Sequence, residues 1–292
     1  MIPAQRRALV ALFVGALCIG LAPIFVRMGG VGPSAAAFWR TLLALPLLAL
    51  IPRRSDEQQA SQGDRRGLWI AGLCFAGDLA VWHRAIGYTS VANATLLANL
   101  SPVFVALALR FFWHERYQTR FWLGLALGLG GAALLVAESF SISARGAFGD
   151  SLGVVAAVFY AGYQIAVSRV RQRCSTRQVM LVTSAVTAGV LLPVVLLTHE
   201  TLFPADARGW WILLALAAIS HVGGQGLIAY ALAGLPAAFA SVGLLVQPVA
   251  ATLFAWILLG ERCSGLQGLG GAIVLSGILL CRLATLRPSP QN

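Results

Sequence analysis

Two stretches of equal length decide the fold of this chain: ANLSPVFVALALRFFWHER, residues 98–116, and LLVQPVAATLFAWILLGER, residues 244–262. Each carries a proline near the start of an apolar run and ends on Glu-Arg. The two prolines, Pro102 and Pro248, are 146 residues apart, and the same offset superimposes the two Glu-Arg pairs. Because this offset is half the length of the chain, it predicts that the protein was built from two related copies.

Around these motifs the 292-residue chain is far more apolar than a soluble protein, with 59% hydrophobic and 11% charged residues. Soluble domains average about 45–50% apolar and about 25% charged residues, so an ordinary soluble enzyme, a disordered chain and a disulfide-stapled secreted module are excluded. A membrane-spanning helix needs about 20 mostly apolar residues. We therefore predict an all-α integral membrane protein with ten transmembrane helices, at residues 8–27, 34–52, 68–87, 90–112, 119–137, 151–170, 178–198, 209–231, 236–259 and 264–284.

The basic residues indicate how these spans are oriented. The net charge is +11, and all 21 basic residues are arginines, mostly in short clusters between apolar runs. A nucleic-acid-binding protein needs a continuous basic face with stacking aromatic residues, so no nucleic-acid partner is expected. With the N-terminus inside, fifteen arginines fall on the inner side and five on the outer side, while Arg40 lies within a span. Cytoplasmic loops are enriched in basic residues, so we expect a multi-pass protein of the cell inner membrane with both termini in the cytoplasm.

The offset divides the chain into two copies, residues 1–137 and 151–287, with five predicted spans each. An odd number of spans places the second copy upside down relative to the first. Inverted repeats are typical of transporters that alternate access around a site near the membrane midplane. The sequence thus predicts two inverted five-helix repeats, and a duplicated scaffold without transport activity is the alternative.

The ten spans, the two five-span halves and the paired Pro and Glu-Arg motifs resemble the drug/metabolite transporter superfamily, most closely its EamA-type branch. The resemblance covers nearly the whole chain and implies an exporter of the cytoplasmic membrane with a central cavity for a small molecule. That branch includes bacterial exporters of amino acids, so we expect amino-acid export by alternating access, with aromatic amino acids as a plausible subgroup. Two alternatives remain: a multidrug, organic-cation or nucleoside exporter of the same architecture, and an intramembrane enzyme or lipid-handling scaffold.

Asp78 is the only acidic residue inside a predicted span, and it indicates a candidate substrate site. An ionised carboxylate facing lipid there costs about 2.5–3.5 kcal/mol or more, so it should face the interior or be protonated. Helical spacing places Phe75 and Trp82 on the same face, and the offset of 146 maps Phe75 onto His221. We expect Asp78, Trp82 and His221 to line the substrate cavity, with Asp78 or His221 binding a proton. Alternatively, Asp78 pairs with Arg40, and His221 bonds a backbone carbonyl.

Arg40 and the sixth span offer further groups for a substrate. Arg40 could bind a carboxylate, because Arg forms bidentate pairs with carboxylates, or its side chain could extend to the outer membrane interface. Tyr160, Tyr163 and Gln164 share one face of the sixth span. These aromatic and amide groups suit an apolar side chain and a zwitterion, or they serve helix packing.

Two uncharged amides complete the candidate substrate-binding residues. Asn99 lies in the fourth span, and Gln247 in the ninth span is the counterpart of Ser101 under the offset of 146. Amides suit α-amino and α-carboxylate groups, and they equally form hydrogen bonds between membrane helices. Both are predicted to bind substrate.

Motifs of catalysis and cofactor binding are absent from the sequence, which has no P-loop, no nucleophile motif and no cluster with metal-ligand spacing. We therefore expect a transporter rather than an enzyme, with no cofactor or metal and with the lipid bilayer and a small molecule as partners. Glycines recur at helix-packing spacing in the fifth and tenth spans: Gly124, Gly128, Gly131, Gly265, Gly268, Gly271 and Gly277. They predict close helix contacts, either within a monomer or in a homodimer.

Overall fold

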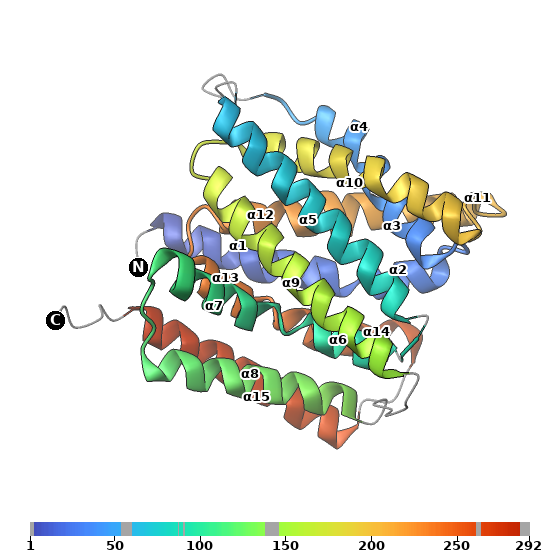
Figure 1. Ribbon diagram of the computed structural model, residues 1–292. Helices are drawn as coiled ribbons and strands as arrows, with labels where there is room; N and C mark the ends of the chain where they lie inside the picture. Colours follow the sequence, from blue (N-terminus) through green and yellow to red (C-terminus); the bar gives the residue numbers. More distant parts are fainter. Residues whose placement is uncertain are drawn as a thin grey trace.

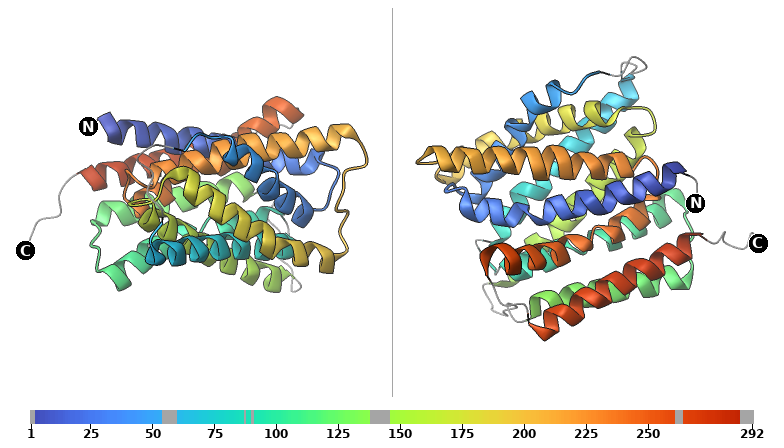
Figure 2. Two further views of the ribbon diagram at one scale, coloured as in Figure 1. Left: turned by 90° about the horizontal axis from the view of Figure 1, so that it is seen from above. Right: turned by 180° about the vertical axis from the view of Figure 1, so that it is seen from behind.

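The computed structural model describes residues 3–53, 60–86, 88–89, 91–137, 146–260 and 264–286. Within these ranges the chain forms helices and no β-strand. The helices run back and forth along one common direction, and α1 begins at the end of the bundle where α15 ends (Figure 1 and Figure 2). The helices are α1 (Pro3–Gly20), α2 (Ala22–Met28), α3 (Pro33–Leu42), α4 (Ala44–Ala49), α5 (Gln62–Ile86), α6 (Val91–Ala98), α7 (Ser101–Trp113), α8 (Thr119–Val136), α9 (Gly146–Val170), α10 (Thr176–Thr198), α11 (Ala207–Ala215), η2 (Leu216–Gln225), α12 (Gly226–Ala231), α13 (Ala237–Gly243), α14 (Val246–Leu259) and α15 (Gly265–Leu286).

Within the described ranges, eight helical stretches are long and apolar enough to cross a membrane: Ala4–Met28, Ala94–Trp113, Thr119–Val136, Gly146–Val170, Thr176–Thr198, Ala207–Ala231, Ala237–Leu258 and Gly265–Thr285. The all-helical prediction is confirmed for the described residues, whereas the number of ten spans stays a prediction. The span predicted at 34–52 corresponds to a shorter apolar stretch, Pro33–Ala49. The span predicted at 68–87 falls on α5, which has 25 residues and carries Asp78 in its interior.

The proline motifs interrupt two helical runs at corresponding places. Residues 99–100 separate α6 from α7, and residues 244–245 separate α13 from α14. Proline has no backbone N–H and clashes with the carbonyl four residues earlier, so a continuous helix is disfavoured just before it. Pro102 lies in the first turn of α7, where its missing N–H has no helical partner to lose.

The ends of α7 and α14 also correspond. Each helix is followed by a left-handed residue, His114 with φ 56° and Gly260 with φ 67°. Left-handed residues commonly close helices because they redirect the chain and let its N–H groups bond the last carbonyls. The two residues are 146 positions apart, so the offset found in the sequence extends to backbone conformation. Glu261 and Arg262 of the second motif lie outside the described residues.

Helices α8 and α15 pack together along one edge of the bundle (Figure 1). Five glycines lie at their contact: Gly124, Gly128, Gly131, Gly270 and Gly277. A Cβ added to Gly277 would lie 2.5 Å from the backbone oxygen of Gly124, so only glycine permits this approach. The predicted close contact occurs within one chain. Gly265 and Gly268 take no part, because an added Cβ would meet nothing within 4 Å.

Other helix pairs bring the predicted polar residues to the middle of the bundle. Helix α5 packs against α9 and α10, and α1 packs against η2 and α12. Helix α3 contacts both α10 and η2. Consequently α3, α5, α9, α10 and η2 surround a common interior region, although they come from both ends of the sequence.

Candidate functional site

A buried imidazole joins three helices at the centre of the bundle. Arg40 Nε in α3 donates to His221 Nδ1 at 3.3 Å, and His221 Nε2 lies 2.8 Å from Ser184 Oγ in α10. A guanidinium only donates hydrogen bonds, so Nδ1 must be the unprotonated nitrogen of a neutral ring. His221 Nε2 then carries the hydrogen and donates to Ser184. The alternative in which His221 bonds a backbone carbonyl is therefore wrong, because side chains from α3 and α10 occupy both ring nitrogens.

An aromatic wall flanks this imidazole. The Phe75 ring lies 5.8 Å from the His221 ring in a stacked arrangement and 4.8 Å from the Tyr163 ring. The Arg40 guanidinium carbon is 5.7 Å from the centroid of Phe75. Tyr160 stacks on Tyr163 with ring centroids 6.0 Å apart. Helices α5 and α9 thus present one continuous aromatic surface beside the charged group of Arg40.

Asp78 adds a negative charge to the same region. It follows Phe75 by three residues in α5, is half-buried and interacts electrostatically with Arg40 and Tyr160. Among the described residues, no hydrogen bond or ion pair within 4.0 Å joins Asp78 to Arg40. The direct salt bridge offered as the structural alternative is therefore absent from the described part of the chain. The carboxylate and the guanidinium act on each other over a longer distance.

Several buried amide and hydroxyl groups beside these charges lack hydrogen-bond partners in the described part of the chain. These atoms are Tyr163 Oη, Gln164 Oε1, Gln225 Nε2 and Gln247 Nε2. The amides of Gln225 and Gln247 are near the hydroxyl groups of the two tyrosines. Gln164 Nε2 donates to Ser101 Oγ at 3.4 Å. Unpaired buried polar groups are rare in native proteins because each costs free energy, so this cluster is suited to a polar ligand.

His221 and Gln225 lie on η2, a π-helix of ten residues, Leu216–Gln225. Wider π-helical turns are uncommon and occur frequently at functional sites. The segment contains Gly223 and Gly224, and Gly224 allows η2 to approach the Cys18 region of α1 closely. The unusual backbone thus presents a histidine and a glutamine to the interior while it packs tightly against α1.

The structure gathers most predicted site residues but not all of them. It places Arg40, Asp78, Tyr160, Tyr163, His221 and Gln247 in one electrostatic and packing neighbourhood, with Gln164 next to Tyr163 in sequence. In the described ranges no ring contact or polar side-chain bond ties Trp82 or Asn99 to that neighbourhood. Trp82 instead packs edge-on against His83 at 5.0 Å, and Asn99 lies at the break between α6 and α7.

Phe75, Ser184 and Gln225 belong to the site but were not among the predicted binding residues. Phe75 lies on the Asp78 face, and Gln225 follows His221 by four residues, so helical spacing could have found both. Ser184 has no such signal, because a serine within an apolar helix is common. In the residues that the structure describes, no group of three His, Cys, Asp or Glu side chains could hold a metal ion.

Comparison with known proteins agrees with this architecture. The sequence profile of the EamA-like transporter family matches residues 6–137 and 147–283. The chain belongs to the EamA-like transporter family. It is thus a multi-pass membrane protein of the drug/metabolite transporter superfamily, as its resemblance predicted.

Relatives of this EamA-family chain are also named as transporters. This chain is 28% identical over 239 residues to the pseudopaline exporter CntI of Pseudomonas aeruginosa, and the match covers 82% of each chain. An uncharacterized transporter of Archaeoglobus fulgidus is 26% identical over 270 residues, covering 92% of this chain and 94% of the relative. A solved crystal structure matches with a TM-score of 0.80 at 20% identity, over 97% of this chain and 100% of the other, which establishes likeness of fold.

Proposed function

We propose that this EamA-family protein is a secondary exporter of a small zwitterionic metabolite, such as an amino acid. The observation that carries the proposal is the pair Arg40 and Asp78, which interact electrostatically in the bundle interior without a direct ion pair among the described residues. A zwitterion supplies a carboxylate for the guanidinium and an ammonium for the carboxylate. One ligand therefore compensates two charges that are costly to keep unpaired inside a membrane.

Hydrogen bonding supports the same ligand class. Arg40 uses its Nε–H for His221, and a guanidinium has five N–H donors. Its terminal nitrogens are suited to a carboxylate, and the neutral His221 fixes the orientation of the guanidinium plane. The unpaired amides of Gln225 and Gln247 extend the polar surface. The rings of Phe75 and Tyr160 offer an apolar face, which favours an amino acid with an apolar or aromatic side chain.

For the transport cycle we propose ten membrane spans in two inverted halves, residues 1–137 and 151–287, with both termini on the cytoplasmic side of the inner membrane. The helix breaks recur within one residue of the offset of 146, and the left-handed caps recur at that offset; both support this topology. The matching contacts of α5 with α9 and of α1 with η2 and α12 support it as well. The polar site would lie where the halves meet, and rocking of one half against the other would alternate access.

Export of organic cations is the second candidate. An aromatic wall beside a single carboxylate, Asp78, is a suitable site for a cation. The Arg40 guanidinium beside the same wall at 5.7 Å from Phe75 repels such a ligand, which is why the zwitterion is favoured. The relative named as a pseudopaline exporter adds pseudopaline to the compounds worth testing.

The experiment is uptake by proteoliposomes that contain the purified protein. The panel holds labelled neutral and aromatic amino acids, nucleosides, organic cations and pseudopaline, each with and without an imposed pH gradient. We expect saturable transport of one or more amino acids and little transport of organic cations. Transport of cations alone would contradict the zwitterion proposal, and no transport of any compound would contradict the exporter proposal. The pH gradient tells proton antiport from facilitated diffusion.

A further inference from the structure

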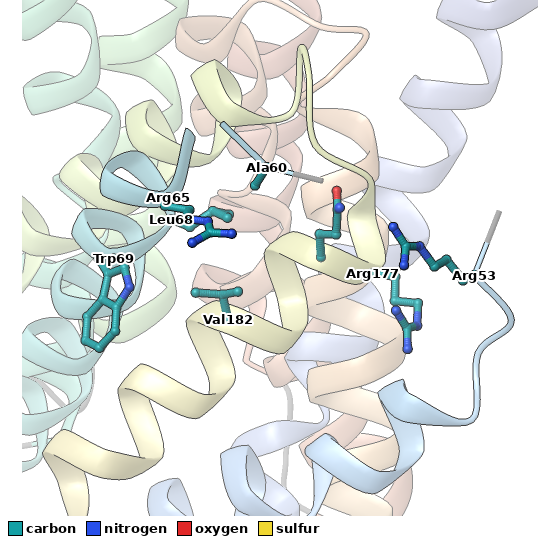
Figure 3. A pocket seen from close by; sticks show the side chains of 8 residues that line it. Arg53, Ala60, Arg65, Leu68, Trp69, Arg177 and Val182 are labelled. Atoms are coloured by element: carbon teal, nitrogen blue, oxygen red, sulfur yellow. The ribbon is translucent and has the colours of Figure 1, made fainter. Parts of the chain in front are cut away.

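A basic cavity lies at the end of the bundle where α1 begins (Figure 1). It has a volume of about 400 Å³ and lies between the N-terminal ends of α5 and α10. Arg53, Arg65 and Arg177 line it together with Trp69, and none of the described lining residues is acidic. Figure 3 shows Arg65 and Trp69 on one side of the space and Arg53 and Arg177 on the other. Three guanidinium groups around one cavity favour an anionic ligand.

One of these arginines has an unused donor inside the protein. Arg177 is half-buried, and its Nε atom is buried without a hydrogen-bond partner among the described residues. A buried N–H without an acceptor is costly, so an acceptor supplied by a ligand would stabilise this end of α10. A phosphate group has several acceptor oxygens and a charge opposite to that of the guanidinium groups.

An apolar groove continues from the basic cavity. Its volume is about 650 Å³, it runs between α4, α5 and α10, and it shares Trp69 and Val182 with the cavity. Its lining residues in the described part of the chain are apolar side chains and Gly189. Trp69 and Leu73 on its wall are 58% and 50% exposed, so the groove opens on the outer surface of the bundle, where lipid lies.

The length of the groove matches one lipid leaflet. Its lining residues on α10 extend from Leu181 to Val190, which corresponds to roughly 14 Å at about 1.5 Å per residue. The hydrocarbon core of a bilayer is about 30 Å thick, so one leaflet contributes about 15 Å. The basic cavity and the apolar groove thus have the dimensions of a lipid head group followed by an acyl chain.

We propose that the cavity and the groove together bind one anionic phospholipid. Arg53, Arg65 and Arg177 hold its phosphate, and an acyl chain lies along α10 past Gly189. Basic pockets between membrane helices on the cytoplasmic side are suited to acidic lipid head groups. A free phosphate would satisfy the arginines but would leave the adjoining groove without an occupant, so the lipid is the favoured ligand. The lipid site is separate from the Arg40 and Asp78 region.

The test is native mass spectrometry of the purified full chain in detergent, titrated with phosphatidylglycerol or phosphatidylcholine. We expect one saturable phosphatidylglycerol molecule per chain, bound at least tenfold more tightly than phosphatidylcholine. Arg65→Gln should weaken its binding about fivefold. Arg66→Gln is the matched control, because Arg66 is the next residue on α5, is exposed and does not line the cavity.

The groove is tested separately with Gly189→Phe, since a Cβ added there meets nothing within 4 Å and the ring would occupy the groove. Gly130→Phe on α8 is its control, because Gly130 is also exposed and also has open space beside it. We expect Gly189→Phe alone to weaken phosphatidylglycerol binding, and millimolar inorganic phosphate not to displace the lipid. Equal binding of the two lipids, equal effects of Arg65→Gln and Arg66→Gln, or displacement by phosphate would overturn the proposal.

Discussion

Substitution Gly277→Ala tests the contact between α8 and α15 quantitatively. The new Cβ would lie 2.5 Å from both Gly124 O and Gly128 N, whereas ordinary van der Waals contact begins near 3.4 Å. Both obstacles are backbone atoms, so no rotamer change relieves the overlap and the helices must separate. Overpacking of this kind costs about 1–3 kcal/mol, offset by up to about 1 kcal/mol from the better helix propensity of alanine. We expect a net loss of about 1–2 kcal/mol in the free energy of unfolding.

The assay is thermal unfolding of the purified protein in detergent, with Gly268→Ala as the control. Gly268 lies on the same helix, is exposed and would place its Cβ in open space. The control should therefore be neutral or stabilising, because only the propensity gain applies. Gly277→Ala should lower the melting temperature by several degrees relative to Gly268→Ala. Equal melting temperatures for the two variants would refute the backbone contact between α8 and α15.

Three further substitutions test other parts of the structure. Glu200→Ala removes the carboxylate that accepts hydrogen bonds from the backbone N–H and the hydroxyl of Ser34 at 2.8 and 2.9 Å, at the start of α3. We expect the free energy of unfolding to fall by about 1 kcal/mol. The melting temperature should fall accordingly, and Glu200→Gln should restore part of it. Gly260→Ala places a Cβ on a residue with φ 67° and should destabilise by about 1–2 kcal/mol, and an unchanged melting temperature would contradict the left-handed cap. Ser184→Ala leaves the buried Nε2–H of His221 without its acceptor. We expect the free energy of unfolding to fall by about 1–3 kcal/mol and transport to become slower. Ser184→Thr keeps the hydroxyl and should recover part of the stability and part of the transport rate.

Much of the fold could be predicted because membrane helices leave strong local signals. Apolar runs gave the helical segments. The breaks at residues 99–100 and 244–245 were not predicted, because the spans at 90–112 and 236–259 were expected to be continuous helices. The span ends differ by a few residues, as for the helix predicted at 151–170 and observed as Gly146–Val170. The span predicted at 34–52 corresponds to Pro33–Ala49, which is shorter than the eight described helical stretches that are long enough to cross a membrane.

The site was predictable only in part, because its contacts join distant positions. Asp78 and His221 were conspicuous as polar residues within apolar segments. The hydrogen bond between Arg40 and His221 links positions 181 residues apart, and no local pattern specifies which helix faces meet. The role of Ser184 follows from the same packing and was missed. The recurring glycines predicted close helix contacts in the fifth and tenth spans, but not that these two helices pack on each other. The contact uses Gly270 rather than Gly265 or Gly268, because spacing alone does not fix the angle at which two helices cross.

The most direct test of a zwitterion held between Arg40 and Asp78 is competition by substrate analogues in proteoliposomes. The analogues are the amide of the transported amino acid, which lacks the carboxylate, and its N-acetyl derivative, which lacks the ammonium. Hydrogen bonds to charged groups contribute about 1.5–3 kcal/mol, so the wild type should prefer the parent compound by roughly 10-fold or more. Arg208→Gln, a charge removal at an exposed residue, should keep both preferences.

We predict that Arg40→Gln abolishes the preference over the amide while it keeps the preference over the N-acetyl derivative. Asp78→Asn should abolish the preference over the N-acetyl derivative while it keeps the preference over the amide. This crossed pattern requires that the two side chains contact opposite ends of one substrate. If both variants lost both preferences in parallel, or if both kept the wild-type preferences, Arg40 and Asp78 would not hold the two charges of a zwitterion.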